Sequence, residues 1–510
     1  MKKGKVYLVG AGPGDAGLIT VKGLGCLRQA DVIIYDRLLD TGLLDSAPPE
    51  AEKIYVGKTP NYHAKKQAEI NQLLVEKAKE GKTVVRLKGG DPFLLGRGGE
   101  EAEALVQAHI PFEVVPGVSS AIAVPAYAGI PVTHRRLSSS LTIITGHEDP
   151  TKDSSSIAWD KLATGADTLV FLMGVGNLPQ IVRQLVKNGR APTTPVALIK
   201  DGTGPRQETI VGTLNDITDK AASKSFSPPA VIVVGDVVRL RDRLRWFDNK
   251  PLFGKRVLVT RACTQASSLS RLLLEHGAQP IEMPAIEIKA IPSSEELDQA
   301  ILDLESYQWL VFTSANGVKP FFERLYSLNR DARWLKDIKI GAIGPATARA
   351  LETRGLWLDY LPQVYTSQGF LAGLKSRNIA GCRFLLPRAD IATRELADGI
   401  TRLGAEVHEV TAYRTVPATE AISQGKQMLM SGEIDIITFA SSSTVTNLLS
   451  LISGEQEVLE RVTVACIGPV TAATAAKAGL KVDIVAQEHT IPGLVEAMEL
   501  YFQRGGKEVK

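Results

Sequence analysis

The stretch VVRLKGGDPFLLGRGGEE at residues 84–101 decides the fold of the first half of this chain. It begins with the β-branched residues Val84 and Val85, continues into a glycine-rich loop, and ends in acidic residues that suit the start of a helix. Five of its residues are glycine, whereas an average usage of about 7% would give roughly one. This strand–loop–helix segment predicts a backbone with positive φ angles that a ligand can approach closely.

The composition restricts the class of protein. A length of 510 residues predicts about three or four domains, and 44% hydrophobic residues provide for sizeable cores. The net charge of +3 is too small to predict a general surface for nucleic acid. The four cysteines form no CxxC pair and the seven histidines no HxxxH or HExxH spacing, so neither a zinc site nor a disulfide framework is indicated.

The sequence gives no sign of a membrane or secretory segment. No run of about 18 apolar residues is present. The first apolar stretch, in MKKGKVYLVGAGPG, is interrupted by glycine too early for a signal peptide. We therefore expect a cytoplasmic protein with no metal and with neither a membrane nor a nucleic acid as its partner.

Strands and helices are predicted to alternate along the first half. An apolar strand at 5–9 leads into GAGPGD, a helix is expected over 18–30, and a strand at 31–35 ends in Asp36. The alternation continues to about Arg239 and predicts α/β layers with ligands at the carboxyl ends of the strands. A charged seam follows, and a new strand begins near Arg256, so we place one domain at 1–247 and another at 254–505.

The second half contains an internal repeat. The segment GKRVLVTRACTQASSLSRLLLEHGAQPIEM from Gly254 is similar to GCRFLLPRADIATRELADGITRLGAEVHEV from Gly381, which lies 127 residues further on. The segments that begin at Trp309 and Lys339 match those that begin at Asp435 and Thr463, in the same order. Two similar α/β lobes with a ligand site between them are therefore expected.

The GAGPGD loop admits a dinucleotide-binding interpretation, with Asp36 at the spacing of a ribose-binding acid. Two residues oppose it. Asp15 occupies the place of the third glycine and would face a pyrophosphate, and Pro13 lacks the N–H that such a loop offers. A cofactor without a diphosphate fits these residues better.

The motifs of the first half resemble the tetrapyrrole methylase family, and within it the uroporphyrinogen-III C-methyltransferases. The similarity covers about residues 4–247 through VGAGPGDAGLIT (9–20), YDRLL (35–39), VGK (56–58), the stretch at 84–101, VVPGVSSAIAVPAYAGIPVTHR (114–135), TLVFLMG (168–174), DGT (201–203) and PAVIVVGDVV (229–238). The resemblance implies two α/β domains with S-adenosyl-L-methionine in a cleft between them. It also implies transfer of two methyl groups to uroporphyrinogen III, giving precorrin-2, and a homodimer formed through this half.

The resemblance also implies roles for particular residues. Asp36 would accept a proton and Lys58 would donate one. The cofactor would be held, mainly by backbone groups, at Pro13, Gly89, Gly90, Asp91, Leu94, Ser119, Ser120, Met173 and Gly202. Because uroporphyrinogen carries eight carboxylates, basic side chains on the matched loops are expected to bind it: Arg37, Lys88, Arg97, His134 and Arg135.

Each of these residues has an ordinary structural alternative. Ser119 and Ser120 can cap a helix, and Asp36 can cap a loop. Met173 can end a strand in the core. Lys58 and the other basic side chains can be solvated surface groups.

The second half, about residues 252–500, resembles uroporphyrinogen-III synthase. The similarity rests on VTRA (259–262), WLVFTSANGV (309–318), IGPATA (343–348), PRAD (387–390), AYRT (412–415), FASSSTV (439–445) and IGPVTA (467–472). It implies two flavodoxin-like lobes, one combining 254–288 with 414–500 and the other spanning 289–410. The chain would cross between them near 286–290 and 410–415.

This second resemblance implies closure of the linear hydroxymethylbilane to uroporphyrinogen III with inversion of the last ring and loss of water. Tyr413 would assist departure of the hydroxyl group. Hydroxyl side chains that would bind substrate carboxylates are Ser314, Thr347, Ser442 and Thr471, although each can also cap a helix. Arg261 and Arg388 occupy equivalent positions of the repeat and are either carboxylate ligands or structural ion-pair formers.

The two resemblances support each other because the product of the second activity is the substrate of the first. They predict a bifunctional α/β enzyme of tetrapyrrole biosynthesis, on the route to siroheme or cobalamin. Two alternatives stay open at this point. The second half could bind tetrapyrroles without catalysis, or the first half could methylate another precorrin or RNA.

Overall fold

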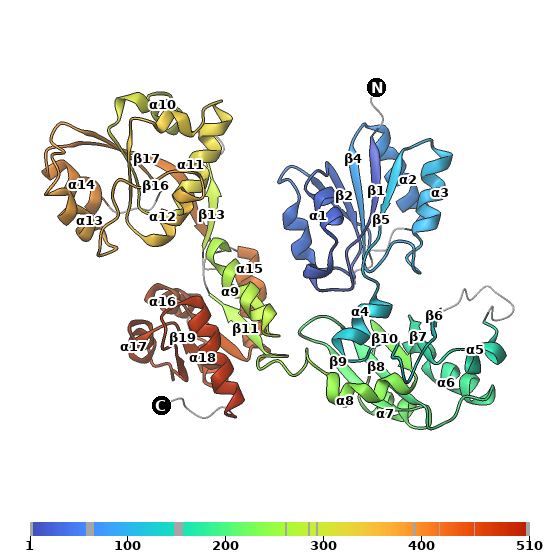
Figure 1. Cartoon of the computed structure of the whole chain (residues 1–510). Coiled ribbons are helices and arrows are strands. Elements are labelled where there is room, and N and C mark those ends of the chain that lie inside the picture. Colours follow the sequence, from blue (N-terminus) through green and yellow to red (C-terminus); the bar gives the residue numbers. More distant parts are fainter. Residues whose placement is uncertain are drawn as a thin grey trace. The chain divides into compact units, whose positions relative to one another are not determined.

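The computed structural model describes residues 4–57, 66–146, 157–260, 263–283, 286–291, 294–390, 394–417, 419–452 and 454–505. The chain divides into two compact units, Met1–Lys255 with Leu274–Gln279, and Arg256–Leu273 with Pro280–Lys510. The strands of the described residues form four five-stranded sheets with helices packed on them, which confirms the predicted α/β class (Figure 1).

The first sheet is parallel throughout and has the order β3-β2-β4-β1-β5. Its strands are β1 (Lys5–Gly10), β2 (Val32–Tyr35), β3 (Glu52–Tyr55), β4 (Thr83–Lys88) and β5 (Phe112–Val115). Helix α1 (Val21–Leu27) lies on one face, and α2 (Gln67–Lys79) and α3 (Gly98–Gln107) lie on the other (Figure 1). Two 3₁₀ turns, η1 (Ala16–Leu18) and η2 (Thr41–Ser46), complete the loops. All five carboxyl ends meet at one edge, as parallel strands require.

The second sheet is mixed, which the alternation of strands and helices did not predict. Its order is β6-β7-β10-β8-β9, and only β6 and β7 are parallel among its pairs in the described residues. The strands are β6 (Leu141–Thr145), β7 (Thr168–Leu172), β8 (Pro195–Lys200), β9 (Glu208–Thr213) and β10 (Ala230–Val234). Its helices are α4 (Ser120–Tyr127), α5 (Trp159–Gly165), α6 (Leu178–Lys187), α7 (Ile217–Ser223) and α8 (Arg241–Leu244), with η3 (Val175–Asn177) and η4 (Asp236–Leu240).

The second unit contains two further sheets. The first of them has the order β12-β11-β18-β19-β20 and consists of β11 (Arg256–Val259), β12 (Gln279–Glu282), β18 (Ile436–Phe439), β19 (Thr463–Cys466) and β20 (Ile484–Val485). It carries α9 (Cys263–Glu275), α15 (Thr419–Met430), α16 (Ser442–Leu451), α17 (Pro469–Lys477), α18 (Ile491–Gln503) and η7 (Gln456–Arg461). We call this part lobe A.

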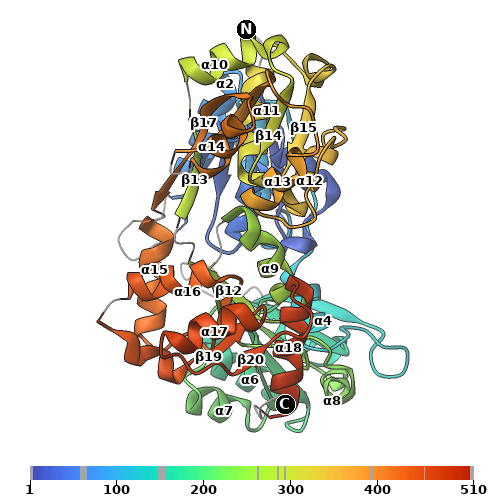
Figure 2. The ribbon, with the colours of Figure 1, turned by 90° about the vertical axis from the view of Figure 1, so that its left-hand side faces the viewer.

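The other sheet of this unit, with its helices, is lobe B. Its order is β13-β17-β16-β14-β15, formed by β13 (Ile286–Ala290), β14 (Trp309–Phe312), β15 (Lys339–Ala342), β16 (Arg383–Ala389) and β17 (Glu406–Pro417). The core clusters place α10 (Glu295–Leu302), α11 (Ala315–Ser327) and α12 (Pro345–Glu352) on one face, and α13 (Ser367–Leu374) and α14 (Glu395–Arg402) on the other (Figure 2). The short turns η5 (Leu304–Ser306) and η6 (Ala332–Leu335) connect its strands.

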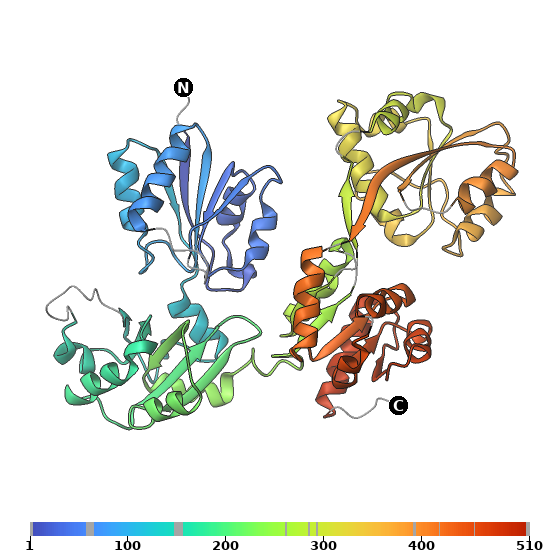
Figure 3. The same ribbon diagram turned by 180° about the vertical axis from the view of Figure 1, so that it is seen from behind.

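Strands β13 and β17 belong to the stretches in which the chain was predicted to cross between lobes. They pair antiparallel from Ile286 opposite Pro417 to Ala290 opposite Tyr413, and their ribbons run side by side (Figure 3). The chain therefore leaves lobe A after β12 through β13 and returns through the end of β17. Tyr413 lies on this returning strand.

Candidate active sites of the two halves

The loops after β1 and β4 touch through their backbones at the carboxyl edge of the first sheet. Gly12 N donates to Gly90 O at 3.3 Å, and Gly90 N donates to Gly12 O at 2.7 Å. Both residues have positive φ angles, 81° and 69°, which glycine adopts without steric cost. This pair of hydrogen bonds holds the loop that contains Pro13 against the loop that contains Gly89 and Gly90. Binding of the cofactor by these residues stays a prediction.

The loop that contains Gly117 packs against these two loops, because glycine residues allow the backbones to approach closely. A Cβ atom on Gly10 would lie 2.5 Å from Gly117 Cα, which no side chain could tolerate. Asp91 fixes the same contact, since its Oδ2 accepts from Gly117 N at 2.9 Å. Its Oδ1 accepts from the amides of Phe93 and Leu94 at 2.8 and 3.1 Å. In this structure Asp91 therefore organises the loop, and its carboxylate is occupied by backbone amides.

Helix α4 begins beside this contact. Ser119 caps it by accepting from Ala121 N at 3.2 Å. A Cβ atom on Gly90 would lie 3.8 Å from Ser120 N and 3.9 Å from Ser119 Cα, so the missing side chain leaves space between the two segments. We call the backbone of Gly12, Pro13, Gly89, Gly90, Ser119 and Ser120 the glycine cradle. Such a surface suits a ligand that is recognised through main-chain groups.

The second sheet contributes the loop between β8 and β9. Gly202 packs so closely on α4 that a Cβ atom would lie 2.4 Å from Val124 Cγ1. Its neighbour Thr203 accepts a hydrogen bond from Asp15 N at 3.1 Å. Asp15 in turn accepts from the Tyr127 hydroxyl at 2.7 Å. Asp15, the residue that argued against a dinucleotide, thus ties the loop after β1 to α4 and to the second sheet.

Two other predicted cofactor contacts, Met173 and Leu94, are not part of the glycine cradle. Met173 follows β7 with a φ of 58°, and 55% of its surface is exposed, so it is not the core residue that the alternative suggested. Leu94 is half-buried and packs on the core around α4. Their contact with the cofactor stays a prediction.

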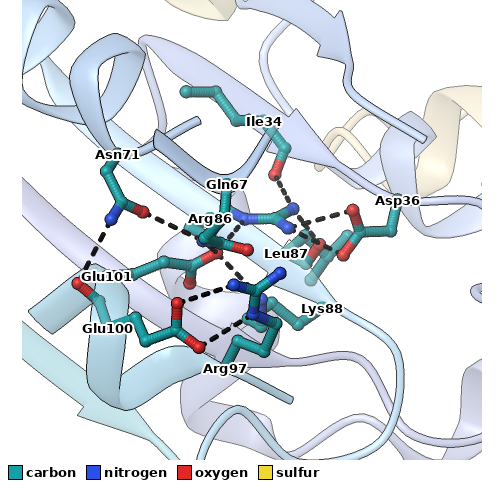
Figure 4. A network of polar contacts seen from close by, with 10 residues as sticks. All are labelled: Ile34, Asp36, Gln67, Asn71, Arg86, Leu87, Lys88, Arg97, Glu100 and Glu101. Carbon is teal, nitrogen blue, oxygen red and sulfur yellow. Dashed lines mark hydrogen bonds and ion pairs between the residues drawn. The ribbon is translucent and has the colours of Figure 1, made fainter. Parts of the chain in front are cut away.

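Asp36 lies immediately after β2, at the same edge of the sheet. Both its carboxylate oxygens accept from Arg86 Nη2, at 2.9 and 2.8 Å (Figure 4). Its side chain is 31% exposed and can therefore meet a ligand. Lys58, the predicted proton donor, lies outside the described residues.

Among the predicted carboxylate ligands, Arg37 and Arg135 are exposed and His134 is half-buried. Arg97 is exposed and forms hydrogen bonds with Glu100 at 2.8 and 2.7 Å. These side chains remain candidates for binding an anionic substrate.

Lys88 was expected to bind the substrate, but the structure places it in a buried ion pair. It is only 5% exposed, and its ammonium donates to buried Glu101 at 2.9 Å. Burial, and then the neighbouring Arg86 charge, lowers the pKa of Lys88. Lys88 points into the core because it follows Arg86 at alternate positions of β4, so this arrangement favours a structural role.

In the second unit, Tyr413 and Ser314 are brought together. Tyr413 is buried, and the side chain of Ser314, at the start of α11, opposes the effect of burial on the pKa of Tyr413. Burial raises the pKa of Tyr413, since phenolate is poorly solvated there. A Cβ atom on Gly317 would lie 3.4 Å from Tyr413 Cε1, so Gly317 packs against the tyrosine ring.

The other predicted hydroxyl ligands lie at helix starts. Thr347 and Thr471 are each the third residue of their helices, α12 and α17, and both are buried. Ser442 begins α16 and shares a hydrogen bond with Thr474 at 2.8 Å. Buried Arg388 pairs with Glu409, which supports its structural alternative, and Arg261 lies outside the described residues.

Comparison with known proteins identifies both halves. The family model of tetrapyrrole (corrin/porphyrin) methylases matches residues 5–218, and that of uroporphyrinogen-III synthase HemD matches residues 267–496. The porphyrin biosynthesis protein HemD of Ruminiclostridium josui is 41% identical over 498 residues, which are 98% of this chain and 98% of that protein. This chain belongs to the tetrapyrrole methylases and to the uroporphyrinogen-III synthases. It is an enzyme that joins a methyltransferase to a synthase.

Two further relatives cover parts of the chain. The uroporphyrinogen-III C-methyltransferase of Bacillus subtilis is 45% identical over 84% of this chain and 89% of its own length. The S-adenosyl-L-methionine-dependent uroporphyrinogen III methyltransferase of Methanosarcina barkeri is 58% identical over 47% of this chain and 94% of its own length. The methylase half thus belongs to a group that uses S-adenosyl-L-methionine.

Sequence reasoning missed two residues of the methylase half, Arg86 and Glu101. Both read as ordinary residues, Arg86 within a strand and Glu101 as an acid in the first turn of a helix. In the structure both are buried and hydrogen-bonded to each other at 3.0 Å. An available signal was the placement of Arg86 and Lys88 at alternate positions of an otherwise apolar strand.

Among the described residues, no helix is long and apolar enough to pass through a membrane.

Proposed function

We propose that this enzyme closes hydroxymethylbilane to uroporphyrinogen III with its residues 254–505 and methylates that product twice with its residues 1–247, giving precorrin-2. The synthase lobes are assigned to 254–288 with 414–500 and to 289–410. The names of the relatives support uroporphyrinogen III as the substrate of the methylase half. The order of the two reactions follows from their chemistry, because one product is the next substrate.

The glycine cradle carries the proposal for the methylase half. Its space beside Gly90 fits a cofactor held by main-chain groups, and we assign S-adenosyl-L-methionine to it. When bound, this molecule supplies an activated methyl group. Pro13, Gly89, Gly90, Ser119 and Ser120 would hold it, with Asp91, Leu94, Met173 and Gly202 at the margins of the site. The protein then contributes mainly by orienting a pyrrole carbon toward the methyl, an effect that can supply roughly 7–11 kcal/mol.

Asp36 is the proposed proton acceptor. A pyrrole carbon that gains a methyl group must afterwards lose a proton, and the half-exposed carboxylate of Asp36 lies at the same sheet edge as the glycine cradle. General-base assistance of this kind contributes roughly 10²- to 10⁴-fold. Lys58 is proposed as the proton donor on the strength of the motif alone.

The carboxylates of uroporphyrinogen are assigned to the exposed basic side chains. Arginine binds a carboxylate through two parallel hydrogen bonds, which favours Arg37, Arg97 and Arg135, with His134 beside them. We do not extend this proposal to Lys88, because its ammonium already serves Glu101.

Tyr413 is the proposed acid of the synthase half. Its raised pKa keeps the hydroxyl protonated at neutral pH, so it can hydrogen-bond to the departing hydroxyl of the substrate. The C–O bond breaks, a pyrrole N–H gives up its proton, and water leaves. The substituted α-carbon of the last pyrrole then attacks the resulting azafulvene and gives a spiro intermediate. The bond from that carbon to its original methylene bridge breaks, the bridge re-forms at the free α-carbon of the same ring, and this carbon loses its proton, which leaves the ring inverted. Ser314, Thr347, Ser442 and Thr471 are proposed to hold substrate carboxylates.

One experiment tests both assignments. The full chain is incubated anaerobically with hydroxymethylbilane, with and without S-adenosyl-L-methionine, and products are separated by isomer and mass. Type III uroporphyrinogen without the methyl donor, and a product heavier by two methyl groups with it, are expected. A type I product would contradict the synthase assignment. Methyl label in added RNA rather than in the tetrapyrrole would contradict the methylase assignment.

We also propose that the enzyme is a cytoplasmic homodimer that associates through its methylase half, without nucleic-acid or membrane partners. The size of the full chain in solution, measured by light scattering, tests the dimer. A mass of one chain at micromolar concentration would contradict it.

A further inference from the structure

Strand β4 is charged at a place where parallel strands are ordinarily apolar. Arg86 and Lys88 occupy alternate positions and share a face with Val84, which packs into the core beneath α2 and α3. Arg86 is only 2% exposed. Because burying an arginine costs free energy that an apolar residue would avoid, stability alone does not explain this residue.

The Arg86 guanidinium forms hydrogen bonds with four other residues or their backbone groups. Nη2 donates to both oxygens of Asp36 at 2.9 and 2.8 Å, and Nε donates to Glu101 Oε1 at 3.0 Å. Nη1 donates to the carbonyls of Ile34 and Leu87, each at 3.3 Å. The planar group can therefore neither rotate nor shift without breaking several contacts (Figure 4).

Glu101 is the buried carboxylate that accepts from Arg86 Nε. It is 0% exposed, and its Oε1 also accepts from Lys88 Nζ at 2.9 Å and from Gln67 Nε2 at 3.3 Å. The two cations, Arg86 and Lys88, balance the two carboxylates, Asp36 and Glu101. Asp36 is the most exposed of these four, so the buried part of the network ends at the proposed proton acceptor.

We propose that Arg86 is a positioning residue that orients the Asp36 carboxylate at the carboxyl edge of the first sheet, with Glu101 holding Arg86 in place. This inference rests on the proposed function, in which Asp36 accepts the proton. The double contact from one nitrogen to both oxygens fixes the plane of the carboxylate, and a general base must be oriented toward the proton that it removes. Arg86 lies behind Asp36 and does not itself need to reach the substrate.

The test is a double-mutant cycle on the full chain. Arg86→Gln with Glu101→Gln removes one positive and one negative charge from the network, so its net charge is unchanged, and the glutamine amide oxygen at position 101 can still accept from Lys88 Nζ. We expect this pair to lower kcat for methyl transfer to uroporphyrinogen III about 10- to 100-fold. The affinity for S-adenosylhomocysteine, measured by calorimetry, should stay within about twofold. In the Asp36→Asn background the same pair should change kcat by less than about twofold, because the carboxylate that Arg86 orients is gone.

Gln67→Met is the matched control. It removes a hydrogen bond from Glu101 but leaves the contact between Arg86 and Asp36 intact, so kcat should stay near that of the parent. If the Arg86–Glu101 pair does not fold, Arg86→Lys is used in the same cycle. It keeps the charge opposite Glu101 but loses the planar fork, so a partial loss of kcat that disappears with Asp36→Asn is expected.

The outcomes separate the inference from the proposed function. If the parent transfers no methyl group to uroporphyrinogen III, the proposed function is wrong and the inference falls with it. If the parent is active and Asp36→Asn equals it, Asp36 is not the proton acceptor and needs no positioning. If Asp36→Asn is impaired but the Arg86 change costs the same factor in both backgrounds, Arg86 acts through stability and the inference alone is overturned.

Discussion

At the scale of single residues, the glycine cradle depends on the absence of side chains. Gly90 holds a φ of 69°, which costs an alanine about 1–2 kcal/mol. Its added Cβ would also point into the space beside Ser119 and Ser120. We therefore expect Gly90→Ala to weaken binding of S-adenosylhomocysteine by about tenfold or more, measured by calorimetry, at a free-energy cost of about 1.4 kcal/mol per tenfold.

Gly189→Ala is the control for backbone strain. This glycine also has a positive φ, 100°, but lies in the turn between α6 and β8, and its Cβ would meet only Thr164 at 3.5 Å. It should lower stability without changing affinity for the cofactor analogue. Equal affinity losses in both variants would mean that strain, and not the cradle, determines the effect.

Tyr413 permits a second prediction at this scale. Tyr413→Phe removes the hydroxyl that is proposed to assist departure of the substrate's hydroxyl group, so ring closure should slow about 100-fold and the share of type III product should fall. Tyr307→Phe is the matched control, because Tyr307 is also buried in lobe B and bonded through its hydroxyl, to His408. Unchanged closure by Tyr413→Phe would remove this residue from the mechanism.

The raised pKa of Tyr413 adds a pH dependence. Because burial favours the neutral phenol, the hydroxyl keeps its proton through the neutral range. The rate of ring closure should therefore show no loss from phenol ionisation between about pH 7 and 9. A tyrosine whose pKa is higher in the folded state destabilises the fold only above about pH 10, where the unfolded chain releases its proton first.

The sequence could indicate the cradle but not the network behind it. Glycine and proline have particular preferences for backbone φ angles, so the spacing of the glycines and Pro13 predicts a loop that a ligand can approach. Burial of Arg86 depends on Glu101, which lies fifteen residues away on another element, and on Asp36 at the end of a neighbouring strand. Lys88 was assigned to the substrate because the motif shows its type but not which side of the strand it faces.

At the scale of elements, β5 is tied to its surroundings by one carboxylate. Glu113 receives hydrogen bonds from Lys22, on α1, and Lys5, on β1, which lower its pKa to about 2. Since the folded pKa lies below the ordinary value near 4.3, this contribution to stability is complete above about pH 4.5 and is lost as the pH falls toward 2. These pairs are exposed, so the effect is small and weakens with salt.

Hydrogen exchange can detect that effect locally. In Glu113→Gln, amides of β1 and β5 should exchange faster than in the parent at pH 6, and the difference should shrink at pH 3 and in 1 M salt. Peptides from 5–10 and 112–115 are compared by mass spectrometry. A difference that is unaffected by pH would contradict the ionic origin.

Helices and strands that are determined by neighbouring residues could be predicted from the sequence, whereas features that depend on distant contacts could not. Strands β1 and β2 and helix α3 follow from apolar runs and acidic helix starts, and all three were expected. The antiparallel pairing of β8, β9 and β10 was not, because strand direction in a sheet depends on contacts distant in sequence. That pairing creates the loop with Gly202 and Thr203 that contacts α4 and Asp15.

At the scale of the whole molecule, the repeat made the two lobes predictable. Equivalent segments such as those from Lys339 and Thr463 form equivalent strands and helices, β15 with α12 and β19 with α17. The antiparallel pair β13 and β17 connects the lobes at the stretches that the family resemblance indicated. A repeat predicts the fold of each copy, but Tyr413 belongs to one copy alone, so its proposed role in ring closure could not be inferred from the repeat.

The two activities should therefore fail independently in one chain. In the full chain with hydroxymethylbilane and S-adenosyl-L-methionine, Asp36→Asn should stop at type III uroporphyrinogen, because only the proposed proton acceptor of the methylase half is lost. Tyr413→Phe should give mainly the type I isomer from spontaneous closure, yet still methylate added type III uroporphyrinogen at the parental rate. Products are assigned by isomer separation and mass. Loss of both activities in either variant would mean that the halves depend on each other for folding or function, and would overturn the assignment of separate sites.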